Sequence, residues 1–290
     1  MGNEPVTTKN AEQRVQQVGL GKSLLWIVFC GTFLAAYFPV LIGLVLLWAN
    51  SDDYSHGFAI VPMALFILWQ KRETLYNAPV RGSWVGLLIA TGSLLVYIIA
   101  RKGEMQTFAS VSMIFFLWGT VIFLFGYQIF KACLFPLLIL FFMIPVPAQI
   151  IAALTIPLQL LVTDASVWLA SLFGVPIISE GNVINLPQKT FQVVQACSGL
   201  RSIMAMLTLG AFLAYFTLRS NVLRGILFLF AIPIAIAVNI FRVFVLVVVF
   251  HSLSIDLSEG TLHTVMGLAI FGIAFGLFLL ASKGFALCER

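Results

Sequence analysis

Long apolar segments alternate with short polar tracts along most of the chain. A helix needs roughly 20 apolar residues to cross a hydrocarbon core of about 30 Å, and most of the segments approach that length. The pattern predicts eight membrane-spanning helices in a single transmembrane domain over residues 24–290. We place them at residues 24–48, 58–70, 84–100, 108–125, 132–147, 198–218, 225–250 and 263–282. The polar stretch before them, residues 1–23, is expected to be a disordered cytoplasmic tail.

The segment 148–174 does not fit this scheme of crossings. It is apolar, but Pro157 and Asp164 are among the residues that interrupt it. A ninth crossing here would place Arg219 and Arg224 outside the cell. We therefore predict a helix that lies at the membrane interface or re-enters the outer leaflet.

The stretch that follows this segment has a different pattern. Two short runs rich in β-branched and aromatic residues, at 183–186 and 190–194, flank Pro187-Gln188-Lys189. Such spacing predicts a short extramembrane β-hairpin.

The positions of the basic residues predict the topology. Eight crossings return both termini to one side of the membrane. The tracts on that side carry eleven Lys and Arg residues, whereas the loops on the opposite side carry three. Because basic loops remain in the cytoplasm, we expect both termini to be cytoplasmic.

The composition agrees with an all-α polytopic membrane protein. Hydrophobic residues make up 61% of the chain, charged residues 9%, and mean hydropathy is +1.07. This leaves too little polar surface to cover a soluble globule. The net charge of +5 does not indicate nucleic-acid binding, because the basic residues lie in short tracts between apolar segments. The expected partner is the lipid bilayer, and the pattern indicates no particular oligomeric state.

One cysteine stands out among the four in the chain. Cys197 lies in Gln195-Ala196-Cys197-Ser198-Gly199-Leu200-Arg201, where an outer loop enters an apolar helix. A thiol near a helix N-terminus, with Arg201 one turn further on, favours the thiolate form. Ser198 is a rival nucleophile but fits the N-cap of the helix, and Gly199 would let a substrate backbone come close. The alternative is a small cysteine that only packs against a neighbouring helix.

The other cysteines do not form a recognisable site. They are scattered without a Cys-x-x-Cys pair, so the sequence predicts neither a structural disulfide nor a metal site, and no cofactor is expected.

Two ionisable residues near the outer ends of later helices are further candidates. Arg242 lies about 12 Å inside the predicted outer end of its helix at 1.5 Å per residue, and Asn239 shares its face. A guanidinium there suits a developing oxyanion, whereas the alternative is internal pairing with Asp164 or a carbonyl group. His263 begins the last helix and suits general acid or base work, and Gly267 leaves that face open for another helix to approach.

The choice of histidine stays open on these grounds. His56 and His251 are also expected on the outer side.

Several motifs together resemble the exosortase/archaeosortase family. They occur in the family's order from about residue 52 to residue 267, which is most of the chain. The motifs are Tyr54-Ser55-His56-Gly57 with Val61-Pro62, the stretch from Phe135-Pro136 to Pro145-Val146-Pro147, Ala196-Cys197-Ser198-Gly199, Asn239-x-x-Arg242 and His263-x-x-x-Gly267.

The resemblance implies a membrane-embedded cysteine peptidase or transpeptidase at the periplasmic face of a bacterial inner membrane. Cys197 matches the family's nucleophile, Arg242 its arginine and His263 its histidine. The implied substrates are secreted proteins with a C-terminal sorting signal, which consists of a short motif such as Pro-Glu-Pro, a transmembrane helix and a basic tail. Many members carry Glu where this chain has Gln195, so the resemblance also suggests a variant subfamily with a different motif.

Two other classes of function remain as alternatives. In a transporter, Arg242 would bind an anionic solute while Asp164 or His263 relays protons. In an assembly or scaffold protein for envelope polysaccharide, the thiol of Cys197 would be dispensable.

Overall fold

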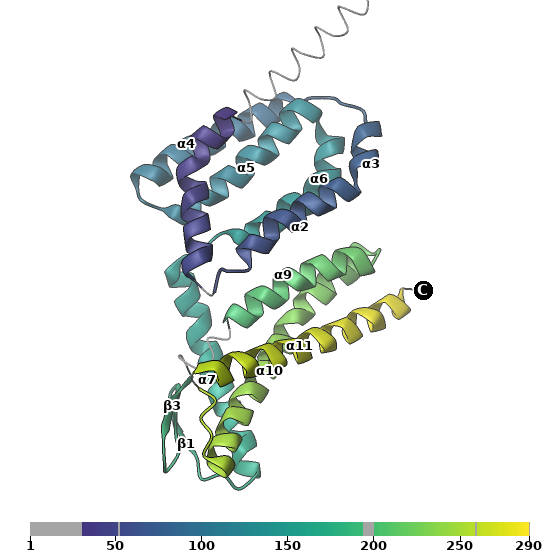
Figure 1. The fold of residues 1–290 in the computed structure, drawn as a ribbon. Helices are drawn as coiled ribbons and strands as arrows, with labels where there is room; N and C mark the ends of the chain where they lie inside the picture. Colours follow the sequence, from purple (N-terminus) through teal and green to yellow (C-terminus); the bar gives the residue numbers. More distant parts are fainter. Residues whose placement is uncertain (1–30, 52, 194–199, 259, 290) are drawn as a thin grey trace, which may run out of the picture.

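The computed structural model describes residues 31–51, 53–193, 200–258 and 260–289. The predicted tail at residues 1–23 and the start of the first predicted span therefore lie outside the described residues. The described chain is helical except for one small sheet, which confirms the all-α polytopic class (Figure 1).

The helices fall into two groups joined by a long connecting helix (Figure 1). The amino-terminal group comprises the first helix Gly31–Asn50, α2 (Gly57–Gln70), α3 (Arg72–Asn77), α4 (Trp84–Lys102), α5 (Gln106–Phe125), α6 (Tyr127–Ile139) and the short 3-10 helix η1 (Leu140–Met143). The connecting helix is α7 (Ala148–Leu172). The carboxy-terminal group comprises α9 (Leu200–Thr217), α10 (Asn221–Leu253) and α11 (Gly260–Cys288).

Every predicted span coincides with a helix, although the boundaries differ. Six helices of the described chain are long and apolar enough to cross a membrane, and α7 is one of them. Three predicted spans correspond to shorter apolar helices, Gly57–Gln70, Tyr127–Met143 and Ser202–Thr217. The span predicted at 132–147 begins five residues earlier and stops before Pro145, since Pro145 and Pro147 cannot donate the backbone hydrogen bonds that would continue the helix.

The connecting helix α7 is a single unbroken helix of 25 residues despite Pro157. It does not turn back on itself, and a re-entrant position in the outer leaflet stays a prediction. Figure 1 shows it leaving the amino-terminal group and running to the far end of α10, next to the sheet. Its placement at the interface stays a prediction, because its length and hydropathy also suit a crossing.

The predicted hairpin is confirmed, and the structure adds a strand to it. Strands β2 (Val183–Asn185) and β3 (Thr190–Gln192) pair antiparallel, with Ile184 opposite Phe191. The additional strand is β1 (Ile178–Glu180), which pairs antiparallel with β2. Strand β1 was not predicted, because three residues show too little alternation to be distinguished from a loop.

The sheet, α7 and the last turns of α10 share one hydrophobic core. Its buried members are Val162, Ala170, Val175, Ile184, Leu186, Phe191, Val193, Val243, Leu246 and Val247. Ser166 of α7 also donates a hydrogen bond to the carbonyl of Ile240, at 3.1 Å. This core explains why α10 reaches 33 residues: protein rather than lipid covers its final turns.

Helices α4 and α5 of the amino-terminal group pack with their backbones in close contact. A Cβ atom on Gly86 of α4 would lie 2.5 Å from the carbonyl oxygen of Gly119, and one on Gly119 of α5 would lie 2.5 Å from the backbone nitrogen of Ala90. Small residues at facing positions let helix backbones touch, which strengthens packing between membrane helices.

Candidate functional site

One polar contact inside the carboxy-terminal group joins two predicted site residues. Arg242 of α10 lies with its Nη2 atom 2.8 Å from Nε2 of His263, which is in the first turn of α11. The two residues are 21 positions apart in the sequence, so only the packing of α10 against α11 brings them together. Both are partly buried.

The partners of His263 define its tautomer. Its Nδ1 atom lies 3.2 Å from the backbone carbonyl oxygen of Leu257, which can only accept a hydrogen bond. The guanidinium of Arg242 can only donate. The neutral ring therefore carries its proton on Nδ1, and the lone pair on Nε2 accepts the hydrogen bond from Arg242.

The guanidinium of Arg242 has a further donor available. Its Nε atom is buried and has no hydrogen-bond partner among the described residues. Arg242 lines a small cavity of about 20 Å³ together with Asn239, Ser202 of α9 and Gly267. A cavity of that size holds about one water molecule. An unpaired cationic donor at a cavity is suited to bind an anionic oxygen.

Gly267 has a more specific role than the sequence indicated. We expected it to leave room for a neighbouring helix. The neighbour is Arg242 of α10: a Cβ atom at residue 267 would lie 3.5 Å from Nη2 of Arg242 and 3.8 Å from its Cζ atom. The open face of α11 therefore accommodates the guanidinium.

The depth of the pair follows from helix geometry. Arg242 lies 18 residues after Arg224 on α10, or about 27 Å at 1.5 Å per residue, and His263 lies 20 residues before Lys283 on α11, or about 30 Å. Each distance is close to the thickness of a hydrocarbon core. The pair therefore lies about one membrane thickness from the basic residues at the other end of the group.

The predicted alternative of pairing between Arg242 and Asp164 is not observed. No ion pair joins Arg242 to Asp164, although the structure describes both residues. Asp164 is exposed on α7, whereas Arg242 is hydrogen bonded to His263.

Four predicted site residues, Gln195, Cys197, Ser198 and Gly199, lie outside the described residues. Helix α9 begins at Leu200, so the backbone of Arg201 is in its first turn, but its side chain is not described. Figure 1 shows the first turns of α9 and α11 at the same end of the carboxy-terminal group.

Tyr54 and His56 belong to a different part of the molecule. The hydroxyl of Tyr54 accepts a hydrogen bond from the backbone N–H of Val146 at 3.1 Å, and Nε2 of His56 lies 3.2 Å from the carbonyl of Phe142. Burial lowers the pKa of His56, and the hydrogen bond to Phe142 opposes that shift only in part. Tyr54 therefore contacts the segment between η1 and α7, and His56 contacts η1 itself. His251 lies in the last turn of α10, and its Nδ1 atom is buried without a hydrogen-bond partner among the described residues.

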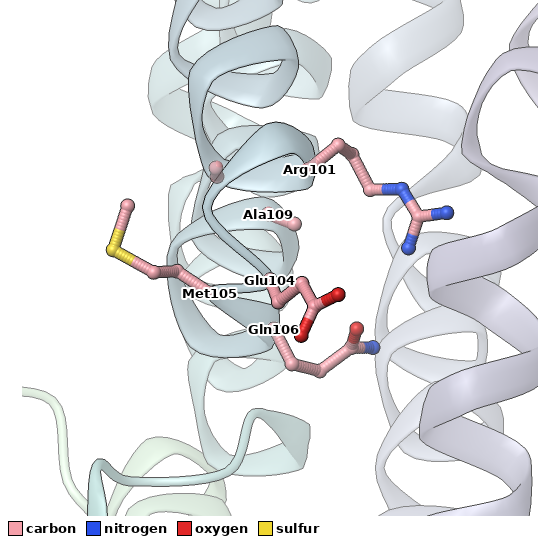
Figure 2. A pocket seen from close by; sticks show the side chains of 6 residues that line it. Arg101, Glu104, Met105, Gln106 and Ala109 are labelled. Atoms are coloured by element: carbon pink, nitrogen blue, oxygen red, sulfur yellow. The ribbon is translucent and has the colours of Figure 1, made fainter.

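A larger cavity lies at the start of α5 and contains none of the predicted site residues. It has a volume of about 330 Å³ and is lined by Arg101, Glu104 and Gln106, among others. Figure 2 shows these three side chains on the same side of the backbone, with Met105 directed away from them. Two opposite charges and an amide make this a polar surface pocket, separate from the Arg242–His263 pair.

Several groups around the Arg242–His263 pair were not predicted from the sequence. Ser202 carries no sequence signal beyond its place in the first turns of α9. Leu257 contributes its backbone carbonyl, which every residue carries, so the residue type gives no signal. Asp256 and Ser258 do carry a signal, because Asp-x-Ser before a helix is typical of a side-chain-capped turn.

The apolar helices define a polytopic membrane protein. The Arg242–His263 contact gives it a polar site at one end of its carboxy-terminal helices. The family model described as transmembrane exosortase (Exosortase_EpsH) matches residues 48–280, which is well over half of the 290-residue chain. The chain therefore belongs to the transmembrane exosortase family. No curated protein and no solved structure matches it.

Proposed function

We propose that the chain is a membrane-embedded cysteine peptidase and transpeptidase that cleaves the C-terminal sorting signal of secreted proteins. Cys197 is the nucleophile, Arg242 stabilises the oxyanion, and His263 transfers the proton. The observation that carries the proposal is the 2.8 Å contact between Arg242 and His263, which pairs a fixed cationic donor with a basic nitrogen.

The chain connectivity supports a role for Cys197 beside this pair. Cys197 precedes Leu200 by three residues, which corresponds to at most about 11 Å of extended chain. Ser202, in the first turns of the same helix, lines the cavity of Arg242. This short connection supports a position of the Cys197 thiol near that cavity.

The first step transfers the thiol proton of Cys197 to Nε2 of His263. That nitrogen then changes from acceptor to donor, so it no longer accepts the hydrogen bond from Arg242. The thiolate attacks the carbonyl carbon of the scissile peptide, and the freed N–H groups of Arg242 bind the developing oxyanion. The C–N bond breaks as His263 returns its proton to the leaving amine. An amine or water then attacks the thioester and regenerates the thiol.

The proposed location is a bacterial inner membrane, with the site facing the periplasm and both termini in the cytoplasm. The charge distribution of the loops supports this orientation, with eleven basic residues against three. A substrate with a basic tail would obey the same rule, which brings its recognition motif to the outer ends of the helices. Gln195 supports a motif that differs from Pro-Glu-Pro.

The test is processing of a secreted protein that carries such a C-terminal signal, followed in cells. Cys197→Ala should leave the full-length substrate in the membrane. Cys288→Ala is the matched control, because Cys288 is a free, exposed cysteine at the end of α11. Normal processing by Cys197→Ala would refute the cysteine mechanism. Reconstituted protein that takes up an anionic solute regardless of this substitution would instead support a transporter.

A further inference from the structure

The loop that positions His263 is anchored by an ion pair outside the proposed catalytic group. Lys189, in the turn between β2 and β3, donates a hydrogen bond to Oδ2 of Asp256, which lies between α10 and α11. Both side chains are about one third exposed, at 33% and 35%. The pair joins the sheet to the segment that leads into α11.

The same carboxylate also folds its own loop. Oδ1 of Asp256 accepts hydrogen bonds from the backbone N–H of Ser258 at 2.8 Å and from its hydroxyl at 2.5 Å. An aspartate that binds the N–H group two residues further on closes a tight turn. The residue inside this turn is Leu257, so the turn fixes the direction of the Leu257 carbonyl.

That carbonyl accepts the hydrogen bond from Nδ1 of His263 at 3.2 Å. It therefore keeps the proton on Nδ1 and leaves Nε2 as the acceptor for Arg242. A continuous series of contacts runs from Lys189 through Asp256 and Leu257 to His263.

The sheet provides a fixed base for Lys189. Phe191, two residues later, is buried and packs edge-on against Phe250 of α10, with ring centroids 5.0 Å apart. The hydroxyl of Thr190 donates to Oδ1 of Asn185 at 3.0 Å across the hairpin. Strand β3, which carries Thr190 and Phe191, precedes the segment that contains Cys197.

We propose that Lys189 and Asp256 are positioning residues for His263, which hold its tautomer and ring orientation through the Leu257 carbonyl. The expected effect on catalysis rests on the proposed function. The expected effect on the His263 tautomer does not depend on what the protein catalyses. An exposed ion pair alone contributes little to stability, so the expected effect of its loss is on His263 rather than on folding.

The direct test is nitrogen NMR of ¹⁵N-histidine-labelled full-length protein in lipid nanodiscs, with the His263 signals assigned from His263→Gln. The unsubstituted protein should show Nδ1 protonated and Nε2 unprotonated. Lys189→Met and Asp256→Asn should move both resonances toward the values of a mixture of tautomers. Lys189→Arg should retain the original pattern, and Lys102→Met is the control for loss of a lysine elsewhere. Unchanged His263 resonances in both Lys189→Met and Asp256→Asn would overturn the inference.

Ser258→Ala gives a second, milder variant, because it removes only the hydroxyl contact to Asp256. It should move the resonances in the same direction by a smaller amount, and the absence of any shift would count against the Asp256 turn. In the processing reaction, loss of a residue that orients a functional histidine should lower kcat by about 10-fold with KM unchanged. If Cys197→Ala proves active while the tautomer still depends on Asp256, the proposed function fails and the positioning inference survives.

Discussion

The guanidinium of Arg242 lies over Gly267, so that a Cβ atom at residue 267 would be 3.5 Å from Nη2. This is ordinary van der Waals contact, which an alanine can make without displacing the arginine. A larger side chain would occupy the space of the guanidinium and separate Arg242 from His263.

Substitutions at Gly267 should therefore depend on size. We expect Gly267→Ala to retain most of the processing activity. Gly267→Leu should lose activity by on the order of 100-fold, because catalysis is sensitive to displacements of about 1 Å. The measurement is the rate of substrate cleavage at equal amounts of folded protein. Gly272→Leu is the control on the same helix, since no atom lies within 4 Å of its Cβ position. Equal activity of Gly267→Leu and Gly272→Leu would show that this contact is irrelevant.

Two of the three histidines, His56 and His263, should separate by function. His56→Ala removes the hydrogen bond to the carbonyl of Phe142 and should lower the free energy of unfolding by about 1 kcal/mol while cleavage largely persists. His263→Ala should abolish cleavage with a smaller effect on stability. Thermal unfolding and cleavage of the same preparations distinguish these effects. A catalytic loss at His56 equal to that at His263 would assign His56 a chemical role.

The close contact between α4 and α5 predicts that alanine at Gly119 lowers the stability of the protein, whereas alanine at Gly92 does not. Gly119→Ala would place a Cβ atom 2.5 Å from the backbone nitrogen of Ala90, and we expect a loss of about 1–3 kcal/mol in stability. Gly92→Ala on α4 has open space around its Cβ position and should be neutral or stabilising by up to about 1 kcal/mol. Unfolding of both variants in the same detergent gives the comparison. A stabilised Gly119→Ala would mean that these helix backbones do not touch.

The pH response of the loop before α11 follows from Asp256. The hydrogen bond from Lys189 is the largest influence on this carboxyl, and those from Ser258 add to it, so that its pKa falls from 3.8 to about 2. Since the pKa is lowered in the folded protein, the stabilisation is present above about pH 3.8 and is lost as the pH falls through about 2. A ¹³C NMR titration of the Asp256 carboxyl should give a midpoint near 2, and Lys189→Met should raise it. The same midpoint in both proteins would exclude the ion pair in solution.

Sequence periodicity predicted the helices well because apolar length is the dominant signal in a membrane chain. It could not predict the Arg242–His263 contact, which depends on how α10 and α11 pack across 21 residues of separation. Nor could it predict the Lys189–Asp256 pair, which joins residues 67 positions apart through a turn of the sheet. Helix α10 also continues 11 residues beyond Arg242, further than predicted, because α7 and the sheet cover its last turns. Local patterns thus determine the elements, and the site arises from contacts between elements.

The account depends most on a covalent bond between Cys197 and the processed protein. We expect the purified enzyme, denatured rapidly during turnover of a substrate, to yield a Cys197-containing peptide joined as a thioester to the upstream fragment. Mass spectrometry identifies both the sulfur atom and the cleaved peptide bond, and His263→Ala should reduce the yield of this species. Processing that proceeds with Cys197 unmodified, or with the acyl group on another residue, would contradict the account.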